Sequence, residues 1–388
     1  MKAGVITPAF LSFGMQTPLE FDIAVIGLGA VGSSALYQLS KSGKRVLGID
    51  RFDPPHVFGS SHGETRITRL AVGEGEDYVA LAKRSHEIWR ELEQLSGEKI
   101  MTQTGGIQID SGVIPWAKHG AEGFWERTVS FAKSQKINHK ILSVEEFRKT
   151  YPAFAVPDSG KIYFEVESGF LRPELAIETQ LRLAKSNGAT IQPNSPVLAI
   201  QKEGGNFKIK TSSSEFICHK LLISAGGWIK DFLGVEQREG FKICRQILHW
   251  LEIEPGFDAW QNHPVWMWGF GSNPEDFIYG FPALDGKTVK MATELFLAID
   301  HPDLLNREVS KEEQIQFWET KVKGRINGVL PNFVKSQVCF YTVTEDARFV
   351  IEPWNGDSRA ILVSACSGHG FKHSAALGEK LAQQLLEA

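Results

Sequence analysis

Apolar and polar residues recur at helical spacing in some parts of this chain and in strand patterns in others. Near the N-terminus these patterns predict a strand–helix–strand unit. The apolar run at residues 21–26 is typical of a buried parallel strand. A helical pattern follows through Ser42, and a second strand pattern ends at Asp50. Two amphipathic helices are predicted at 78–96 and 173–188, where apolar side chains recur at helical spacing. These elements predict an α/β fold.

Strand patterns dominate the rest of the chain, and the aromatic-rich segments among them predict a broad antiparallel sheet. The polar loop at 59–66 is expected to lead into a helical stretch in which Arg66 and Arg69 share a face. The other expected elements are strands at 100–110, 189–201, 206–211, 215–224, 241–253, 264–297, 337–343, 349–351 and 360–365, and helices at 310–324 and 373–387.

The turn between the first strand and the first helix is Gly27-Leu28-Gly29-Ala30-Val31-Gly32. Gly27 permits a tight turn, Gly29 lets the backbone approach a pyrophosphate, and Gly32 lets the helix pack closely on the strand. Asp50 ends the second strand, where an acid is expected to accept hydrogen bonds from a ribose. The unit predicts a bound dinucleotide but leaves open whether it is NAD, NADP or FAD.

The nucleotide-binding layer is predicted to be split along the chain, with sheet-rich segments inserted between its parts. A nicotinamide dehydrogenase usually keeps its nucleotide fold continuous, so this discontinuity favours a flavoprotein. The expected division is a nucleotide-binding domain of 20–85, 165–230 and 345–388, a substrate domain of 86–164 and 231–344, and an N-terminal extension of 1–19.

Composition excludes several classes of function. The formal net charge of -4 gives no electrostatic reason to expect nucleic acid or an anionic membrane as partner. No apolar run reaches the ~20 residues that span a bilayer, and the first residues make a poor signal peptide. The cysteines are widely spaced without metal-ligand spacing, which argues against a disulfide scaffold or zinc site. A cytoplasmic protein without a bound metal is expected.

Six further segments, in order along the chain, match one known family. They are Asp53-Pro54-Pro55-His56, Gly59 to Arg69, Gly73-Glu74-Gly75, Tyr279-Gly280-Phe281-Pro282, Cys339-Phe340-Tyr341-Thr342 and Ser367 to Lys372. The chain resembles the monomeric sarcosine oxidase and N-methyltryptophan oxidase family, flavin amine oxidases of the D-amino-acid-oxidase superfamily. The resemblance runs from about Phe21 to the closing helix. It implies a Rossmann-type FAD-binding domain built from discontinuous segments and a substrate domain with an antiparallel sheet.

The resemblance also implies an activity. A secondary amino acid, N-methyl or cyclic, would be oxidised to an imine while molecular oxygen is reduced to hydrogen peroxide, and the protein would act as a monomer. The alternatives are a dehydrogenase of the same fold with a protein or quinone acceptor, a deaminating enzyme of the D-amino-acid-oxidase type, a nicotinamide-dependent enzyme, and a flavin-binding module without catalysis.

Several catalytic roles are carried over from the family. Arg69 and Lys372 would bind the substrate carboxylate, a task that suits a planar guanidinium and a compact ammonium. Lys290 would assist oxygen reduction, with Lys287 as the competing choice and an exposed strand edge as the alternative for the whole segment. The other implied residues are His62, which lies near the flavin or is an ordinary loop histidine, and Tyr279 and Tyr341, which line the pocket or are core tyrosines.

Cys339 has two possible roles, one suggested by its strand and one by the family resemblance. A single cysteine in an apolar strand is most often a small buried hydrophobe. The resemblance instead implies a thioether from Cys339 to the 8α-methyl carbon of the flavin. The other implied FAD-binding residues are Gly27, Gly29, Ala30, Val31, Gly32, Asp50, Arg51, Ser60, Thr65, Arg66, Val197, Ala225, Gly226, Trp228, Gly368, His369, Gly370, Phe371 and Lys372.

Two features depart from the family pattern. Glu294 stands where sarcosine oxidases carry a pocket histidine, which changes the charge of the cavity. Trp266 and Trp268 are expected either to add an aromatic wall or to pack in the core. The sequence therefore leaves the natural substrate open.

Overall fold

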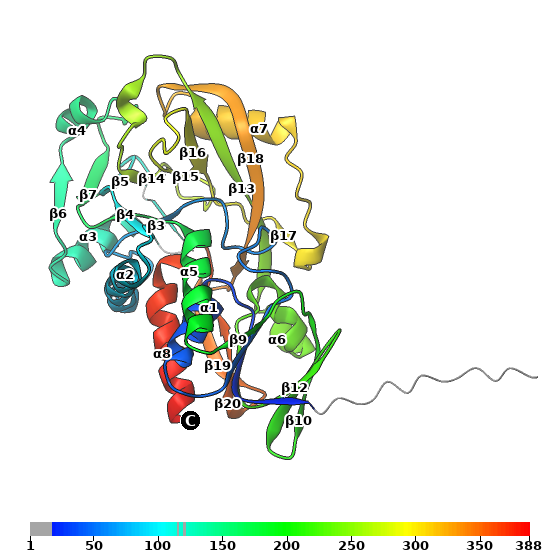
Figure 1. The fold of residues 1–388 in the computed structure, drawn as a ribbon. Coiled ribbons are helices and arrows are strands. Elements are labelled where there is room, and N and C mark those ends of the chain that lie inside the picture. The colour runs from blue at the N-terminus through cyan, green and yellow to red at the C-terminus, as the bar shows by residue number, and fades with distance from the viewer. Residues whose placement is uncertain (1–17, 115, 119–121) are drawn as a thin grey trace, which may run out of the picture.

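Two large β-sheets organise the protein, as the computed structural model shows (Figure 1). The structure describes residues 18–114, 116–118 and 122–388. The predicted N-terminal extension lies outside the described residues up to position 17, and the first strand already begins at Leu19. None of the described helices is long and apolar enough to cross a membrane.

The first sheet has eight strands and a parallel centre. Its path is β10 (Val197–Glu203), β11 (Asn206–Thr211), β12 (Glu215–Ile223), β1 (Leu19–Ile26), β2 (Val46–Ile49) and β9 (Thr190–Gln192), with β20 (Asp357–Ser364) paired to β12 and β19 (Val350–Trp354) to β20. Parallel pairs join β1 to β2 and β12, β2 to β9, and β12 to β20.

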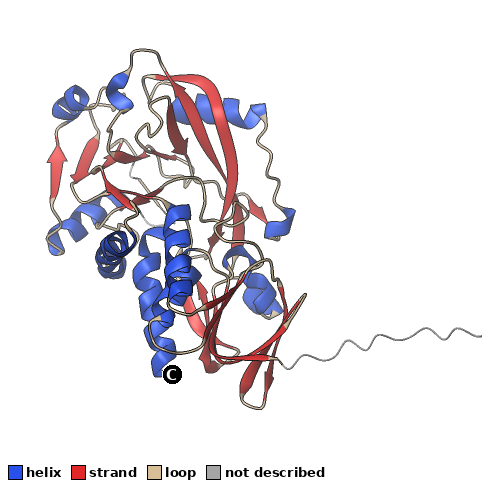
Figure 2. Ribbon diagram, viewed as in Figure 1, coloured by secondary structure: helices blue, strands red, loops and turns tan. Residues whose placement is uncertain are grey.

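Helices bury one face of this sheet. They are α1 (Ala30–Ser40), α2 (Asp77–Ser96), α5 (Pro173–Ser186) and α8 (Ser374–Glu387), and α1, α5 and α8 lie side by side against the sheet (Figures 1 and 2). Apolar side chains of the helices and of the strands form one continuous buried cluster, which fixes the start of α1 above the strand ends.

Close packing between β1 and α1 explains two of the glycines. Gly27 has a φ of +85°, and a Cβ built on Gly32 would lie 1.8 Å from the carbonyl oxygen of Gly27. Any side chain at position 32 would therefore push the helix away from the turn.

The second sheet has nine strands. Its path is β17 (Ala298–Ile299), β13 (Lys242–Ile253), β16 (Thr288–Ala292), β15 (Phe277–Gly280), β14 (Val265–Gly269), β5 (Gly106–Asp110), β7 (Lys161–Glu165) and β6 (His139–Leu142), with β18 (Val329–Val343) paired to β13. The pairing is antiparallel except between β14 and β5, which run parallel, so the sheet is mixed rather than purely antiparallel.

Shorter elements complete the fold. They are the small sheet of β3 (Arg66–Thr68), β8 (Gly169–Leu171) and β4 (Met101–Gln103), and the helices α3 (Phe124–Ser134), α4 (Val144–Thr150), α6 (Val235–Arg238) and α7 (Lys311–Phe317), the last continued by a π-helical turn over Trp318–Val322.

The predicted α/β class is confirmed, while some element predictions are wrong. The stretch 100–110 forms two strands in different sheets, because Gly105 turns the chain with a φ of +77°. The stretch 189–201 likewise contains β9 and β10, which lie at opposite ends of the first sheet and are separated by Pro193 and Pro196.

The helical stretch predicted after the loop at 59–66 is also wrong. Arg66 begins strand β3, which pairs with β8, so Arg66 and Arg69 do not share a helical face. The three-residue spacing was too short a pattern to distinguish a helix from an extended segment.

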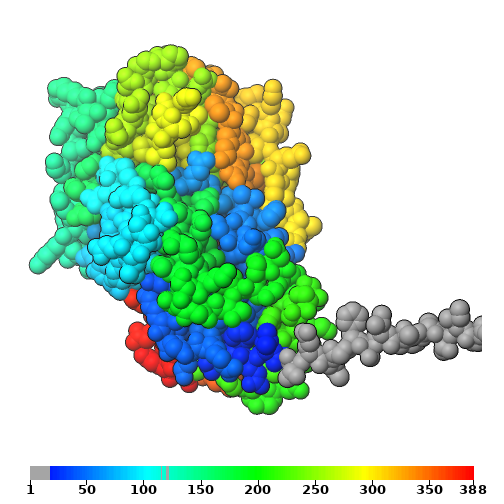
Figure 3. Space-filling model, in the orientation of Figure 1, coloured from blue at the N-terminus to red at the C-terminus, as the bar shows by residue number. Residues whose placement is uncertain are grey.

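The two-domain division stays a prediction, and the sheet composition supports it. Strands of the first sheet come from residues 19–49, 190–223 and 350–364, and those of the second from 106–165 and 242–343. In the space-filling view, dark blue, green and red segments adjoin in the lower half of the molecule, and teal, yellow-green, yellow and orange segments adjoin in the upper half (Figure 3).

Candidate functional site

A cavity of about 260 Å³ is lined by residues of both sheets. The first sheet contributes the ends of β1, β2 and β20 with the turns that follow them, and the second contributes residues of β14, β15 and β18. Ligands of open α/β folds bind outside the carboxyl ends of the parallel strands, which is where this cavity lies.

The glycine turn forms one end of the cavity. A Cβ built on Gly29 meets no atom within 4 Å, so the backbone there faces open space. The carboxylate of Asp50 accepts hydrogen bonds from the backbone N–H of Leu28 at 2.7 Å and of Phe52 at 2.8 Å. Each carboxylate oxygen can accept more than one hydrogen bond, so Asp50 keeps capacity for a ribose hydroxyl. The N-terminus of α1 adds unpaired N–H groups that favour a phosphate.

Most of the predicted FAD-binding residues meet around this cavity. Gly32, Thr65 and Cys339 are the exceptions, since they do not line it. The predicted residues in the wall are Gly27, Gly29, Ala30, Val31, Asp50, Arg51, Ser60, Arg66, Val197, Ala225, Gly226, Trp228, Gly368, His369, Gly370, Phe371 and Lys372.

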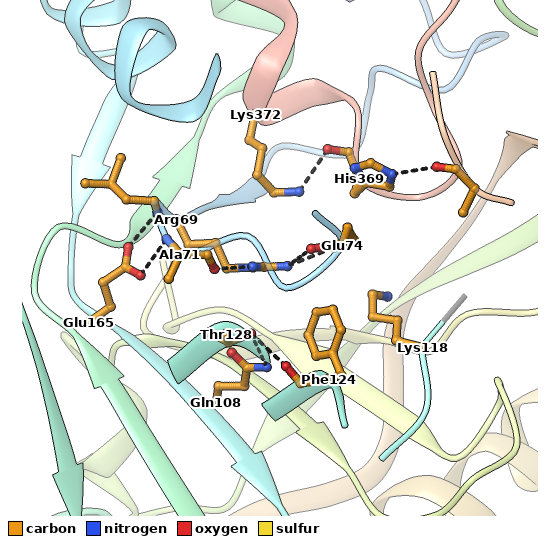
Figure 4. A network of polar contacts seen from close by, with 12 residues as sticks. Arg69, Ala71, Glu74, Gln108, Lys118, Phe124, Thr128, Glu165, His369 and Lys372 are labelled. Atoms are coloured by element: carbon orange, nitrogen blue, oxygen red, sulfur yellow. Dashed lines mark hydrogen bonds and ion pairs between the residues drawn. The ribbon is translucent and has the colours of Figure 1, made fainter. Parts of the chain in front are cut away.

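Arg69 lies in the cavity wall and forms a buried ion pair with Glu74. Its Nη2 is 2.8 and 2.6 Å from the two carboxylate oxygens, and the side chains are only 6% and 4% exposed (Figure 4). Its Nη1 donates to the carbonyl of Ala71, and Nε has no partner among the described residues. Burial raises the pKa of Glu74, but Arg69 and Lys372 lower it more, so that it lies well below its usual value.

The backbone that carries Arg69 is fixed by a second carboxylate. Glu165 accepts hydrogen bonds from the N–H groups of Leu70 at 2.6 Å and Ala71 at 3.0 Å (Figure 4). Tyr163 and Ser168 donate to the same carboxylate at 2.8 and 2.9 Å. These bonds keep the guanidinium in one position, which bidentate recognition of an anion requires.

Lys372 approaches the same region from the glycine-flanked turn before α8. Its Nζ donates to the carbonyl of His369 at 2.8 Å. Burial lowers its pKa to about 7, while Glu74 opposes this shift and Arg69 adds to it. The Lys372 side chain is therefore present both as the ammonium and as the neutral amine near neutral pH.

Lys290 lies on β16, in the interior of the second sheet between β13 and β15. Its Nζ donates to the carbonyl of Gly63 at 2.5 Å and to the carbonyl and hydroxyl oxygens of Thr65 at 3.0 and 2.9 Å. Burial, with Arg66, lowers its pKa well below the usual value. The competing Lys287 is exposed, and the strand-edge interpretation is wrong because β16 is paired on both sides.

His62 lies close to these groups and is fully buried. Neither ring nitrogen has a partner among the described residues. Burial, with the charges of Arg66, Arg307 and Lys290, lowers its pKa to about 3, so the ring is neutral. His62 does not line the cavity, so its place near the flavin stays a prediction.

The predicted cysteine and tyrosines come from two strands of the second sheet, Cys339 and Tyr341 from β18 and Tyr279 from β15. Cys339 on β18 is opposite Gln246 of β13, and the residue is 1% exposed. Burial raises the thiol pKa, and the charges of Arg66 and Lys290 oppose this shift. The hydroxyls of Tyr279 and Tyr341, both in the cavity wall, are 3.4 Å apart. Burial raises the pKa of Tyr279 to about 12.

The tryptophan wall is not found. Trp266 and Trp268 are 0% and 1% exposed and pack in the core of the second sheet, whereas Met267 between them lines the cavity. Strand alternation explains this difference, because neighbouring residues point to opposite faces. Phe277 also lines the cavity.

Lys118 and Cys366 are among the residues of the cavity wall that the sequence did not identify. Lys118 pairs with Glu294, and no motif surrounds it that could have identified it. Cys366 was not named as a site residue, yet it is in the wall, and its position directly before the Ser367 to Lys372 motif was the available signal.

The residues present fit a dinucleotide. The backbone is open at Gly29, and Asp50 keeps acceptor capacity at the end of β2. Arg69 and Lys372 add cationic side chains to the same cavity wall, beside the carboxylate of Glu74.

Comparisons with known proteins agree with this geometry. The profile of a family described as FAD dependent oxidoreductase matches residues 22–384. Monomeric sarcosine oxidase of Bacillus sp. (strain B-0618) is 34% identical over 374 residues, covering 95% of this chain and 92% of the relative. N-methyl-L-tryptophan oxidase of Yersinia pestis (strain Pestoides F) is 31% identical over 368 residues, covering 93% and 94%.

Solved structures show the same fold at lower identity. NikD, an unusual amino acid oxidase essential for nikkomycin biosynthesis, superposes with a TM-score of 0.81 at 17% identity, covering 95% of this chain and 94% of NikD. L-proline dehydrogenase from P. horikoshii gives a TM-score of 0.74 at 17% identity, covering 96% and 94%. The nicotinamide-dependent alternative is therefore not supported. The chain belongs to the FAD dependent oxidoreductases and, within them, to the family of monomeric sarcosine oxidase and N-methyltryptophan oxidase.

Proposed function

We propose that this protein oxidises a secondary amino acid, N-methylated or cyclic, to the imine. The amine loses one hydrogen from nitrogen and one from a carbon bound to it, a C=N double bond forms, and the two electrons and two protons convert molecular oxygen into hydrogen peroxide. The observation that carries the proposal is the pair of cations, Arg69 and Lys372, in the wall of a cavity that also contains the dinucleotide turn and two tyrosines. Sarcosine and N-methyltryptophan oxidases among the relatives support this substrate class.

Arg69 and Lys372 would bind the substrate carboxylate. Arg69 has an Nε–H without a partner among the described residues, and Lys372 carries a compact ammonium close to the same glutamate. Phe277, Tyr279 and Met267 supply less polar walls, and desolvation there favours the neutral amine, which is the reactive form.

FAD, when bound, supplies the two-electron acceptor that this oxidation requires. Gly27, Gly29 and the start of α1 would hold its pyrophosphate, and Asp50 its ribose. Cys339 is the proposed point of covalent attachment, which the matching Cys-x-Tyr-Thr segment and the nearby charges of Arg66 and Lys290 support. We also propose a monomer in a reducing, cytoplasmic setting, since all four cysteines are free and relatives are named monomeric.

The experiment that tests this proposal is anaerobic reduction of the bound flavin. N-methyl and cyclic amino acids are expected to bleach it, and peroxide is expected when air is admitted. If no amine bleaches the flavin, the proposal is wrong. Bleaching without peroxide indicates a dehydrogenase, and bleaching by primary D-amino acids alone indicates a deaminating enzyme.

The lowered pKa of Lys372 predicts that the affinity for a carboxylate ligand depends on pH. A carboxylate without an ionisable amine, such as methoxyacetate, is expected to bind with constant affinity below pH 7 and to weaken about tenfold per pH unit above it. The reason is that the ammonium, with a pKa of about 7, loses its proton in this range and with it the attraction for the carboxylate. Flavin absorbance titrations from pH 6 to 9 measure this dependence. Lys372→Met is the control and should show weak, pH-independent binding; a slope that survives in this variant contradicts the assignment.

Lys290 predicts a selective loss of oxygen reactivity. Replacement by methionine is expected to slow reoxidation of the reduced flavin by about a hundredfold, because a fixed cation stabilises the negative charge that develops on oxygen. Anaerobic reduction by substrate should change much less. Stopped-flow spectroscopy separates the two half-reactions, and Lys287→Met on the exposed turn before β16 is the matched control. Equal losses in both half-reactions argue against this role.

A further inference from the structure

A second buried ion pair lies in the wall of the same cavity. The Nζ of Lys118 is 2.6 and 2.7 Å from the two carboxylate oxygens of Glu294, and each side chain is 5% exposed. Both residues line the cavity. Taking two charges out of water is costly, so a buried pair on a cavity wall calls for an explanation beyond stability.

The pair lies near the carboxylate-binding end, separated from it by one aromatic ring. Phe124, at the start of α3, has the guanidinium carbon of Arg69 5.4 Å and Lys118 Nζ 5.9 Å from its centroid (Figure 4). The distance between these two cations therefore cannot exceed the sum of those two distances. A small amino acid can span it with one extended substituent, on its nitrogen or on its α-carbon, which we call the arm.

The position of Lys118 is fixed by its neighbours. Trp116 packs so closely on Gly269 that a Cβ there would lie 2.1 Å from the indole. The Trp116 ring stacks on Phe277 with centroids 5.4 Å apart, and Lys118 Nζ lies 4.4 Å from the centroid of Phe277. Lys118 is thus positioned by aromatic packing and is not a solvated surface lysine.

Glu294 is fixed equally well. It follows β16, and the hydroxyl of the preceding Thr293 donates to the carbonyl of Phe277 at 2.5 Å. A Cβ built on Gly368 would lie 2.9 Å from Glu294 Oε1 and 2.9 Å from the ring of Tyr341. The carboxylate therefore lies beside Tyr341 over the backbone of the predicted FAD-binding turn.

Charge decides which substrate group suits this pair. Lys118 and Glu294 neutralise each other, so an additional carboxylate would face Glu294, and an additional ammonium would face Lys118, each without net attraction. An ammonium has three donors and a carboxylate about four acceptor sites, so both partners keep hydrogen-bonding capacity. A group that accepts and donates side by side, without net charge, fits both.

We propose that Lys118 and Glu294 form a specificity site for a hydroxyl or carboxamide group on the arm of the substrate that extends away from its carboxylate. This proposal rests on the proposed amino-acid oxidation and narrows its substrate class. The lysine donates to the oxygen of the arm, and the glutamate accepts its O–H or N–H.

Isosteric substrate pairs test the proposal. The probes are N-(2-hydroxyethyl)glycine against N-propylglycine, with the group on the nitrogen arm, and N-methylhomoserine against N-methylnorvaline, with the group on the α-carbon arm. In at least one pair the hydroxyl compound is expected to show a kcat/KM about tenfold higher than its apolar isostere. An apolar preference in both pairs overturns the proposal.

The double variant Lys118→Met/Glu294→Leu removes both charges, so neither is left buried alone. It is expected to reverse the preference mainly through KM, while the affinity for methoxyacetate and the flavin content stay near those of the unmodified protein. The control is Lys323→Met/Glu319→Leu, which removes an exposed ion pair of 2.7 Å. An unchanged preference in the first double variant overturns the proposal.

The two proposals fail in different ways. If sarcosine or proline bleaches the flavin but none of the four probes does, the second site is wrong and the oxidation stands. If no amine bleaches the flavin, the proposed function fails, and the specificity site falls with it.

Discussion

Replacing Cys339 with serine is expected to abolish covalent attachment of the flavin. Acid precipitation of the unmodified protein should give a yellow pellet, whereas the variant should give a colourless pellet and a yellow supernatant. The physical reason is that a serine hydroxyl has no thiolate chemistry under these conditions, although it occupies nearly the same buried space. The glycine turn and Asp50 are unchanged, so FAD should still bind non-covalently.

Cys366→Ser is the matched control for this prediction. Cys366 lines the cavity, and burial raises its thiol pKa as it does that of Cys339. The control should keep its yellow pellet. A colourless pellet from the unmodified protein contradicts covalent attachment. If Cys366→Ser alone loses the attached flavin, Cys366 and not Cys339 is the attachment residue. Mass spectrometry of the flavin-bearing peptide distinguishes β18 from the turn after β20.

Replacing Arg69 with lysine is expected to lower kcat/KM by about two to three orders of magnitude. A lysine keeps the charge, but it cannot bond Ala71 and Glu74 and still present a planar fork to a carboxylate. The affinity for methoxyacetate should fall in parallel, since both ligands use the same cations. Steady-state kinetics and flavin titrations measure the two effects.

Arg84→Lys is the control for Arg69. Arg84 also makes a two-pronged contact, with Glu379 at 2.8 Å through both Nε and Nη2, but it lies on a partly exposed helix face. Its replacement should leave kcat/KM unchanged, because surface ion pairs contribute about 0–1 kcal/mol. If Arg69→Lys lowers the melting temperature and flavin content together with activity, the loss is structural, and the assignment to carboxylate binding is wrong.

Much of the fold could be predicted because its signals are local. The first strand and helix are encoded by apolar periodicity and by the glycine spacing between them. Predictions failed where the chain passes from one strand to a distant one, from one sheet to another at Gly105 and across the first sheet between Pro193 and Pro196. There the hydrogen-bond partners lie far away in sequence, and propensity alone cannot identify them.

In the candidate site, too, residues in local motifs could be predicted, whereas those that depend on distant contacts could not. Arg69 and Lys372 lie in matching segments, and Lys290 follows one, so the family resemblance identified them, and the structure places Arg69 and Lys372 in one wall. The pattern of Trp266 and Trp268 did not reveal which face of β14 meets the cavity, and the packing of the second sheet decided it.

By itself, the sequence determined the dinucleotide turn, the α/β class and the family, because short stretches of residues carry each of these signals. Only the tertiary structure revealed the pairing of Lys118 with Glu294, whose residues are 176 positions apart. It also showed Glu74 paired with Arg69, and Lys372 buried enough to lower its pKa to about 7. Burial and charge pairing depend on which distant segments fold together, and these contacts set the electrostatics of the cavity.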